Sequence, residues 1–481
     1  MSKIKKLYSN MSLPVKASFW YLFASVLQKG ISLITTPIFT RVLTTREYGV
    51  VSIYASWEAI LTIFATLYLH QGVYNNGMAK FRSKRDEYNL TMQTTSSALT
   101  VALLVIYLFG HNTFNTLMGL TTNIMLLMFV DIFFSTAVSF WSIRNRYEFK
   151  YKSVVIVTIV TSVLSTLLSL VLVFILKEAR AEAKILGQII VRVVIYSFIY
   201  YINIKRGKKL FNSHFAKYAL AFNIPLLPHY LSTMILNQSD RIMISNMVGL
   251  SEAGIYSLAY NAAMLMTIVT TSLNNSFAPW MYEEIAANRF KNIGKSAIKI
   301  IILVGFLCLA VVLFAPEIIT ILGSKEYGSA IWVIPPTAMS VLFIFVYCCF
   351  ANLEFYYEKK KFILIGSLMS AIFNLSLNAI FIPMFGFVAA GYTTLASYIV
   401  FTVFHYVAMT RTCKEKNVEN PYNGILLLVV CGGYVVLALV CNALYLNSSV
   451  RYATVVILAV VVIIVGVKYK NGIINVFRRK R

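Results

Sequence analysis

The sequence predicts an all-α integral membrane protein with about 14 transmembrane helices, arranged as two six-helix halves around a central cleft plus a C-terminal helix pair. Three observations predict this fold class. The 481-residue chain is 59% hydrophobic, with a mean hydropathy of +0.73. Apolar runs long enough to cross a hydrocarbon core about 30 Å thick recur from end to end. The loops between these runs are alternately rich and poor in lysine and arginine.

Fourteen apolar segments supply the predicted helices. Their ranges are 17–43, 46–72, 93–113, 121–143, 153–176, 185–204, 218–248, 253–278, 297–316, 330–353, 362–384, 387–410, 423–446 and 452–468. No segment between them is long enough for a separate soluble domain. The predicted organisation is a cytoplasmic N-terminus (1–16), a first half (17–204), a basic cytoplasmic linker (205–217), a second half (218–410), and helices 13 and 14 with a basic cytoplasmic tail (411–481).

The net charge of +25 has a topological explanation. With the N-terminus in the cytoplasm, 33 of the 43 lysines and arginines fall in cytoplasmic segments, seven in outer loops and three within helices. This asymmetry alternates from loop to loop, as the positive-inside rule requires, and it places both termini in the cytoplasm. The basic charge therefore predicts no nucleic-acid partner.

The residue patterns offer no catalytic or metal-binding chemistry. The six cysteines show no Cys-x-x-Cys or Cys/His spacing, and most lie in apolar segments, where cysteine behaves as a small hydrophobe. No nucleophile–base arrangement, phosphate-binding glycine-rich loop or large outer loop is present in the sequence. We therefore expect a protein that is not an enzyme and that binds no metal or other cofactor.

An internal repeat links the two halves. TTREYGVVSIY at 44–54 matches GLSEAGIYSLA at 249–259, each at the outer turn after an odd-numbered helix. Because six helices separate the copies, both halves enter the membrane in the same orientation, related by an axis along the membrane normal. Six-helix repeats about a cleft are typical of transporters, although a duplicated scaffold would show the same pattern.

Prolines interrupt the first helix of each half, at Pro37 in helix 1 and at Pro225 and Pro228 in helix 7. Proline removes a backbone donor, and the freed carbonyl needs another partner or a wet cavity. Interrupted helices at corresponding positions of two repeats indicate a binding site. Ordinary proline kinking is the alternative. Helix 10 is expected to begin at the sequence IPPT.

Charged residues within the predicted helices need partners, since each costs roughly 2.5–3.5 kcal/mol at a lipid-facing helix centre. They are Lys29, Glu58, Asp131, Arg192, Asp240 and Arg241, with Arg41 and Glu354 at helix ends. These charges could form structural ion pairs between helices, and Asp131 with Arg192 is a candidate pair. Glu354 is assigned to the cytoplasmic boundary. Lys29 has no neighbouring acid, which predicts an anionic ligand or an acid across the cleft.

Adjacent Asp240 and Arg241 point about 100° apart on a helix, so each needs its own partner. A polar cavity with helix 1 or helix 2 opposite would supply these partners. The histidines are scattered singly, without ligand spacing. We expect packing or interfacial positions for His70 and His405, and keep His229, beside Pro228, as a candidate for proton coupling.

Three longer stretches resemble a known family. TPIFTRVLTTREYGVVSIY (36–54), SDRIMISNMVGLSEAGIYSLAYNAA (239–263) and NLSLNAIFIPMFGFVAAGYTTLASYIV (374–400) resemble the helix 1–2, 7–8 and 11–12 signatures of bacterial polysaccharide and oligosaccharide flippases. These belong to the multidrug/oligosaccharidyl-lipid/polysaccharide (MOP) exporter superfamily. The motifs are mainly structural, with Gly49 and Gly254 suited to tight helix turns and Pro383 with Gly386 ending helix 11.

The resemblance implies a flippase in the bacterial cytoplasmic membrane that exports undecaprenyl-diphosphate-linked oligosaccharide for surface polysaccharide such as O-antigen or capsule. It implies alternating access, a proton or sodium gradient as driving force, and assembly proteins as partners besides the lipid bilayer. A diphosphate needs cations, and the candidates are Lys29, Arg41, Arg192 and Arg241. Glu58, Asp131 and Asp240 would balance these charges or bind the coupling ion.

Other functions remain open at this point. Lipid II flippases carry a richer set of arginines in the cleft, which counts against lipid II as the substrate. A multidrug/cation antiporter of the same superfamily is the main alternative, although it would usually have twelve helices and an acid-dominated cleft. A membrane glycosyltransferase or polymerase should show a sizeable loop with clustered acids or arginines. The last alternative is a scaffold for envelope assembly that transports nothing.

Overall fold

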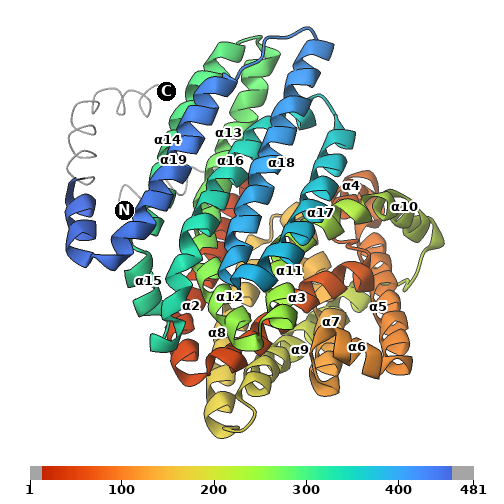
Figure 1. Ribbon diagram of the computed structural model, residues 1–481. Coiled ribbons are helices and arrows are strands. Elements are labelled where there is room, and N and C mark those ends of the chain that lie inside the picture. Colours follow the sequence, from red (N-terminus) through yellow and green to blue (C-terminus); the bar gives the residue numbers. More distant parts are fainter. Residues whose placement is uncertain (1–12, 458–481) are drawn as a thin grey trace, which may run out of the picture.

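The computed structural model describes residues 13–457, and these residues form helices and no strand (Figure 1). Thirteen helical segments in this range are long and apolar enough to cross a membrane. They are α2 (Leu13–Val42), α3 (Thr45–Thr66), α5 (Arg85–Phe109), α7 (Thr122–Tyr147), α8 (Tyr151–Ile175), α9 (Arg180–Gly207), α10 with α11 (Ser213–Asn223 and Leu227–Met247), α12 with α13 (Leu250–Met264 and Met266–Ala286), α14 (Phe290–Leu313), α16 (Ile334–Tyr356), α17 (Lys360–Phe385), α18 (Val388–Glu415) and α19 (Gly424–Ala443).

Shorter elements join them: α4 (Val73–Lys80), α6 (His111–Met118), α15 (Ala315–Leu322) and the 3-10 segments Arg82–Lys84, Ile224–Leu226, Lys325–Trp332 and Leu444–Leu446. Residues 448–457 are helical and begin the predicted fourteenth helix. The rest of that helix, 458–468, lies outside the described residues. The all-α membrane fold predicted from the sequence is confirmed.

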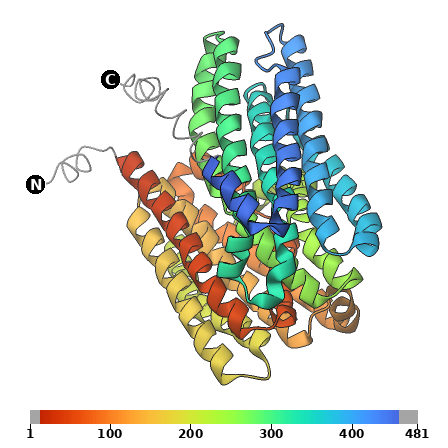
Figure 2. The same cartoon turned by 60° about the vertical axis from the view of Figure 1, so that its left-hand side comes forward.

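The helices pack as two groups, which Figure 2 shows as a red-to-yellow group and a green-to-blue group. In the first group α9 packs on α7 and α8, and α2 packs on α8. In the second, α18 packs on α16 and α17, and α17 on α11. The groups meet where α3 lies against α11 and α12. The prediction of tight turns at Gly49 and Gly254 is wrong, because both glycines lie inside these contacting helices.

Two of the proline predictions are confirmed and one is wrong. A 3-10 segment at Ile224–Leu226 interrupts helix 7, and α16 begins with prolines in its first turn. By contrast, α2 runs unbroken through Pro37. Next to the proline, Thr40 Oγ1 donates to the Thr36 carbonyl at 3.0 Å and Arg41 Nη1 to the Pro37 carbonyl at 2.9 Å.

Two helix ends also test the predictions. The second helix ends at Thr66, not at residue 72, because Leu67 and Tyr68 adopt left-handed backbone angles (φ 45° and 52°). The Leu67 carbonyl is used instead by Asn223 Nδ2, which donates to it at 2.6 Å. As predicted, α17 ends at Phe385 with Gly386 following at φ 72°.

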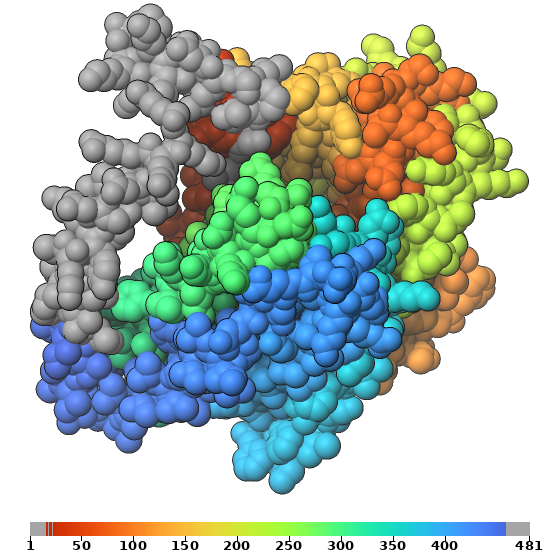
Figure 3. All heavy atoms as spheres, turned by 90° about the horizontal axis from the view of Figure 1, so that it is seen from above, coloured from red at the N-terminus to blue at the C-terminus, as the bar shows by residue number. Residues whose placement is uncertain are grey.

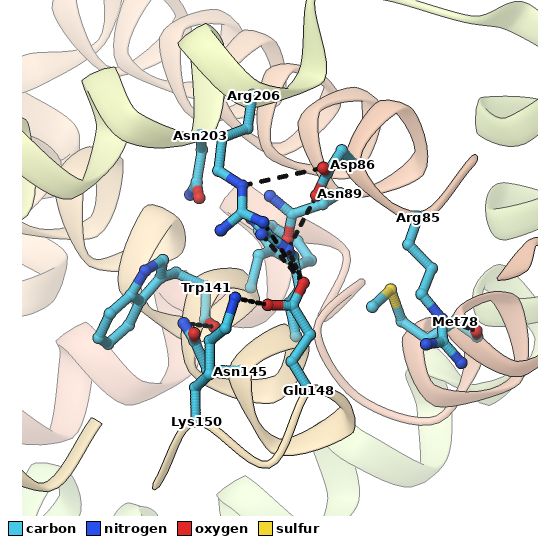
Figure 4. Close-up of polar contacts among 12 residues, drawn as sticks. Met78, Arg85, Asp86, Asn89, Trp141, Asn145, Glu148, Lys150, Asn203 and Arg206 are labelled. Atoms are coloured by element: carbon cyan, nitrogen blue, oxygen red, sulfur yellow. Dashed lines mark hydrogen bonds and ion pairs between the residues drawn. The ribbon is translucent and has the colours of Figure 1, made fainter. Parts of the chain in front are cut away.

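An ion-pair network ties together the basic-loop ends of α5, α7 and α9 (Figure 4). The fully buried Arg144 contacts Asp86 at 2.9 Å and Glu148 at 3.1 Å. Arg206 approaches the same two acids at 3.8 and 3.5 Å, and Lys150 contacts Glu148 at 2.5 Å. Burial acts to raise the pKa of Glu148, but the hydrogen bond from Lys150 and the two arginine charges outweigh it and lower that pKa. The network fixes this end of the first group.

Candidate substrate cavity and charge clusters

Two adjoining cavities lie along one face of α2. The larger, of about 480 Å³, is enclosed by α2, α7, α8 and α9, and the smaller, of about 360 Å³, by α2, α3 and α12. They are adjacent because Ser32, Thr36 and Tyr48 line both. Figure 3 looks onto the end formed by the α13–α14 and α18–α19 turns and shows a hollow between the two groups, with α2 in red at its side. The cavities therefore lie at and beside the boundary between the groups.

A stripe of polar residues on α9 forms one wall of the larger cavity. Lys184, Gln188, Arg192 and Tyr196 are spaced four residues apart, which places them one above another on a single face. Facing them are hydroxyl residues of α8, among them Thr158 and Ser162, and residues of α2, among them Gln28. This wall can form many hydrogen bonds, which suits a sugar or phosphate group better than an apolar one.

Lys184 is the unexpected member of this wall. Its side chain is only 8% exposed, and its Nζ lies 4.2 Å from the centroid of Phe39 and 4.9 Å from that of Tyr48. In the described part of the chain, no carboxylate forms an ion pair with it. A buried cation without a counter-charge is costly, so the aromatic faces and the polar cavity must offset its desolvation.

Arg192 forms an ion pair with Asp131, as the sequence predicted. Its Nη1 lies 2.5 Å from Asp131 Oδ2 and 3.5 Å from Glu58 Oε1. Asp131 is fully buried and also accepts hydrogen bonds from Ser135 at 3.0 Å and Tyr54 at 3.4 Å. Three of the predicted site residues thus form one cluster, in which Arg192 still reaches the larger cavity.

Asp240 is enclosed by neutral donors from three helices. Tyr256 of α12 and Thr394 of α18 each donate to its Oδ2 at 2.6 Å, and Asn378 of α17 donates to Oδ1 at 2.7 Å. The side chain is 1% exposed. All these partners belong to the second group, so the prediction that helix 1 or 2 supplies a partner is wrong for Asp240.

Arg241 has its own set of acceptors, as its orientation requires. Its guanidinium donates to Gln238 Oε1 at 2.9 Å and to Asn261 Oδ1 at 3.0 Å, and it lies 4.4 Å from the Tyr260 ring centroid. Gln238 in turn accepts a hydrogen bond from Ser56 of α3, the predicted helix 2, at 3.2 Å. Arg241 is therefore connected across the boundary between the groups through Gln238.

The remaining two candidates lie apart from these clusters. Lys29 is exposed on α2 and lines the smaller cavity together with Asn261, and no acid in the described residues pairs with it. Arg41, at the opposite end of α2, donates to the backbone carbonyls of Ile321 at 3.2 Å and Thr320 at 3.5 Å. Arg41 lines neither cavity and binds the C-terminal end of α15.

Comparison with known proteins identifies the family. The family described as "Polysaccharide biosynthesis protein" matches residues 15–284, more than half of the chain. This chain belongs to the polysaccharide biosynthesis protein family. It is accordingly a multi-pass membrane transporter of the MOP superfamily and not an enzyme. The MatE family of the same superfamily also matches residues 225–380.

The individual proteins that resemble this transporter share little sequence identity with it. A Haemophilus influenzae protein named "Lsg locus putative protein 1" is 27% identical over 183 residues, which cover 37% of this chain and 45% of that protein. The lipid II flippase MurJ, inward closed, superposes with a TM-score of 0.69 at 14% identity, over 95% of this chain and all of MurJ. An inward-facing MATE multidrug transporter gives 0.65 at 13% identity, over 80% of this chain and 96% of the other. At these identities the two structures show a shared fold.

Sequence reasoning missed Lys184 in this transporter, because its position near the start of α9 counts as an outer-loop position. A signal was nevertheless present: Lys184, Gln188 and Arg192 follow at intervals of four in a segment that is otherwise apolar. Such spacing predicts one polar face on a helix. Tyr256, Asn378 and Thr394 carried no comparable signal, because their contact with Asp240 depends on how four helices pack.

Proposed function

We propose that this transporter moves the anionic head group of a lipid-linked oligosaccharide, of the undecaprenyl-diphosphate class, across the cytoplasmic membrane. The observation that carries the proposal is Lys184, a buried amine without a counter-ion that faces a polar cavity of about 480 Å³. A phosphate group would supply the missing charge, and the hydroxyl-rich walls suit a sugar. Family membership supplies the connection to polysaccharide.

Lys29 and Arg192 are the other proposed contacts for the diphosphate, since both line the adjoining cavities. Arg241 reaches the smaller cavity through Asn261. Arg41 is bound to backbone carbonyls of α15 and lines neither cavity, so we propose no substrate contact for it. The proposed partners beyond the substrate are the bilayer and polysaccharide assembly proteins.

Movement is proposed to follow alternating access, with both termini and the basic loops in the cytoplasm. The hollow of Figure 3 lies at the basic-loop end and would then open to the cytoplasm. A proton or a sodium ion is the proposed driving ion, with Asp240 as one carboxylate for it and Glu58 with Asp131 as another. Supporting this are the three polar side chains of α12, α17 and α18 that are hydrogen-bonded to Asp240.

A deletion strain tests the proposal directly. Its lipids are extracted and its surface polysaccharide is assayed, with and without a plasmid carrying the wild-type chain. Loss of polymer with build-up of a complete undecaprenyl-diphosphate oligosaccharide is the expected result, and the mass of that intermediate identifies the sugar. Normal surface polymer with changed sensitivity to cationic compounds would instead favour the multidrug alternative, which the MatE match raises.

A further inference from the structure

A second buried acid–base pair lies in the second group, away from both cavities. Glu354 of α16 is 0% exposed and His405 of α18 is 1% exposed. His405 Nδ1 lies 2.9 and 3.0 Å from the two carboxylate oxygens of Glu354. Glu354 lies in the last turn of α16, and its carboxyl is buried there and bound to a histidine. His405 is more than a packing residue for the same reason.

The surroundings leave this pair without a compensating charge. In the described part of the chain, no lysine or arginine forms an ion pair with Glu354. The groups facing His405 are the rings of Tyr347, Phe401 and Phe404, with centroids 5.7, 4.6 and 5.6 Å away. Tyr347 comes from α16, and His229 of α11 is the other titratable neighbour. With Glu354 ionised and His405 neutral, the pair carries one negative charge in an apolar site, and binding one proton removes it.

The other imidazole nitrogen is tightly packed and has no hydrogen-bond partner. His405 Nε2 is buried without a hydrogen bond. A side chain at Gly366 of α17 would place its Cβ 2.9 Å from this nitrogen, so the imidazole fits here because residue 366 is glycine. The next residue, Ser367, is hydrogen-bonded through its Oγ to His229 Nδ1 at 2.9 Å. His229 is partly exposed and follows the 3-10 interruption that precedes α11.

We propose that Glu354 and His405 form a binding site for a single proton, and that its occupancy is coupled to the position of α11 against α17. The proton adds as an N–H bond at His405 Nε2, and it leaves to solvent by the reverse step. A protonated Nε2 needs an acceptor, which this conformation lacks. Protonation therefore favours a conformation that brings a hydroxyl, histidine or water to Nε2 beside Gly366. This site is additional to the carboxylates of the proposed transport cycle, and only its link to transport rests on the proposed function.

Nitrogen NMR of the purified full chain, labelled with ¹⁵N-histidine in nanodiscs, tests the proton site. The chain has five histidines, and a His405→Gln variant assigns the signal of interest. As the pH is lowered, binding of this proton should change the His405 signal from neutral to doubly protonated. In Glu354→Gln the signal should stay neutral at the same pH values, because the carboxylate that stabilises the imidazolium is gone. The proposal would be overturned if the His405 signal did not change with pH, or if it changed with pH in Glu354→Gln as it does in wild type.

The matched control is Glu415→Gln, which removes a carboxyl from the same helix α18 where it is 39% exposed and paired with Lys359. This variant should leave the His405 signal unchanged. Export measured across external pH then tests the coupling: Glu354→Gln should lose pH dependence that wild type and Glu415→Gln retain. Identical pH profiles for all three would refute the coupling. If the chain exports no lipid-linked sugar at all, the NMR result still decides the proton site, so the two failures are distinguishable.

Discussion

Gly49 of α3 and Gly254 of α12 lie against each other at the point where the two groups of helices meet. A Cβ on Gly254 would sit 2.9 Å from the Gly49 nitrogen, and a Cβ on Gly49 would sit 1.9 Å from the Leu250 carbonyl oxygen. These glycines occupy equivalent positions in the internal repeat. The repeat therefore has a residue without a side chain in each copy at the point where the two copies touch, which lets the two helix backbones approach closely.

Substituting alanine at either glycine should destabilise the transporter. The added methyl group has no room against backbone atoms, so the helices must separate, at a cost of about 1–3 kcal/mol. Thermal unfolding of purified Gly49→Ala and Gly254→Ala in detergent should occur at lower temperature, with reduced export in cells. Gly432→Ala in α19 is the control, since nothing lies within 4 Å of its Cβ position. Unchanged unfolding of both variants would show that this contact is not tight.

Lys184→Met should abolish export without loss of stability. Methionine keeps the length and the apolar stem of lysine but removes a charge that is buried without a partner, so unfolding should occur at the same or a higher temperature. Export should fall at least tenfold, because the proposed phosphate contact is lost. Lys177→Met, at an exposed position near the other end of the α8–α9 turn, should export normally. Wild-type export by Lys184→Met would remove Lys184 from the substrate site.

The pairing of Arg192 with Asp131 predicts a non-additive double variant. Arg192→Met leaves a fully buried carboxylate unpaired, and should cost on the order of 1–3 kcal/mol, below the range for fully buried pairs because Arg192 is 30% exposed. Adding Asp131→Asn should restore much of the stability, since the orphaned charge is removed. Unfolding temperatures of the two single variants and the double variant measure this coupling. Additive losses would indicate that the pair contributes nothing.

The sequence predicts the helices well because a membrane helix needs only a long apolar run, and it predicts the site poorly because site contacts come from packing. Asp131 and Arg192 could be paired in advance, since intramembrane charges must be satisfied and few are available. Lys184 could not be placed by composition, because the same residue near a helix end is ordinarily a loop charge. Glu354 and His405 lie 51 residues apart in sequence. Only the contact of α16 with α18 brings them together.

Glu317 and Arg451 give a pH-dependent prediction at the end of the second group that lies opposite the basic loops. Arg451 donates to both carboxylate oxygens of Glu317, at 2.5 and 2.7 Å, and to the Leu313 carbonyl at 2.9 Å. The hydrogen bonds from Arg451 lower the pKa of Glu317 from 4.5 to about 2. Because the folded-state pKa lies below the unfolded one, the pair stabilises the fold above pH 4.5, and this contribution is lost as pH falls toward 2.

Glu317→Gln should therefore unfold at a lower temperature than wild type at about pH 6, and the difference should be clearly smaller near about pH 3. The expected effect is about 1 kcal/mol, since Glu317 is partly exposed and solvent screens the pair. Thermal unfolding in detergent at both pH values measures it, with the wild type at each pH correcting for other titrating groups. A stability difference that is the same at both pH values would mean that this ion pair does not anchor α15 to the helix that begins at residue 448.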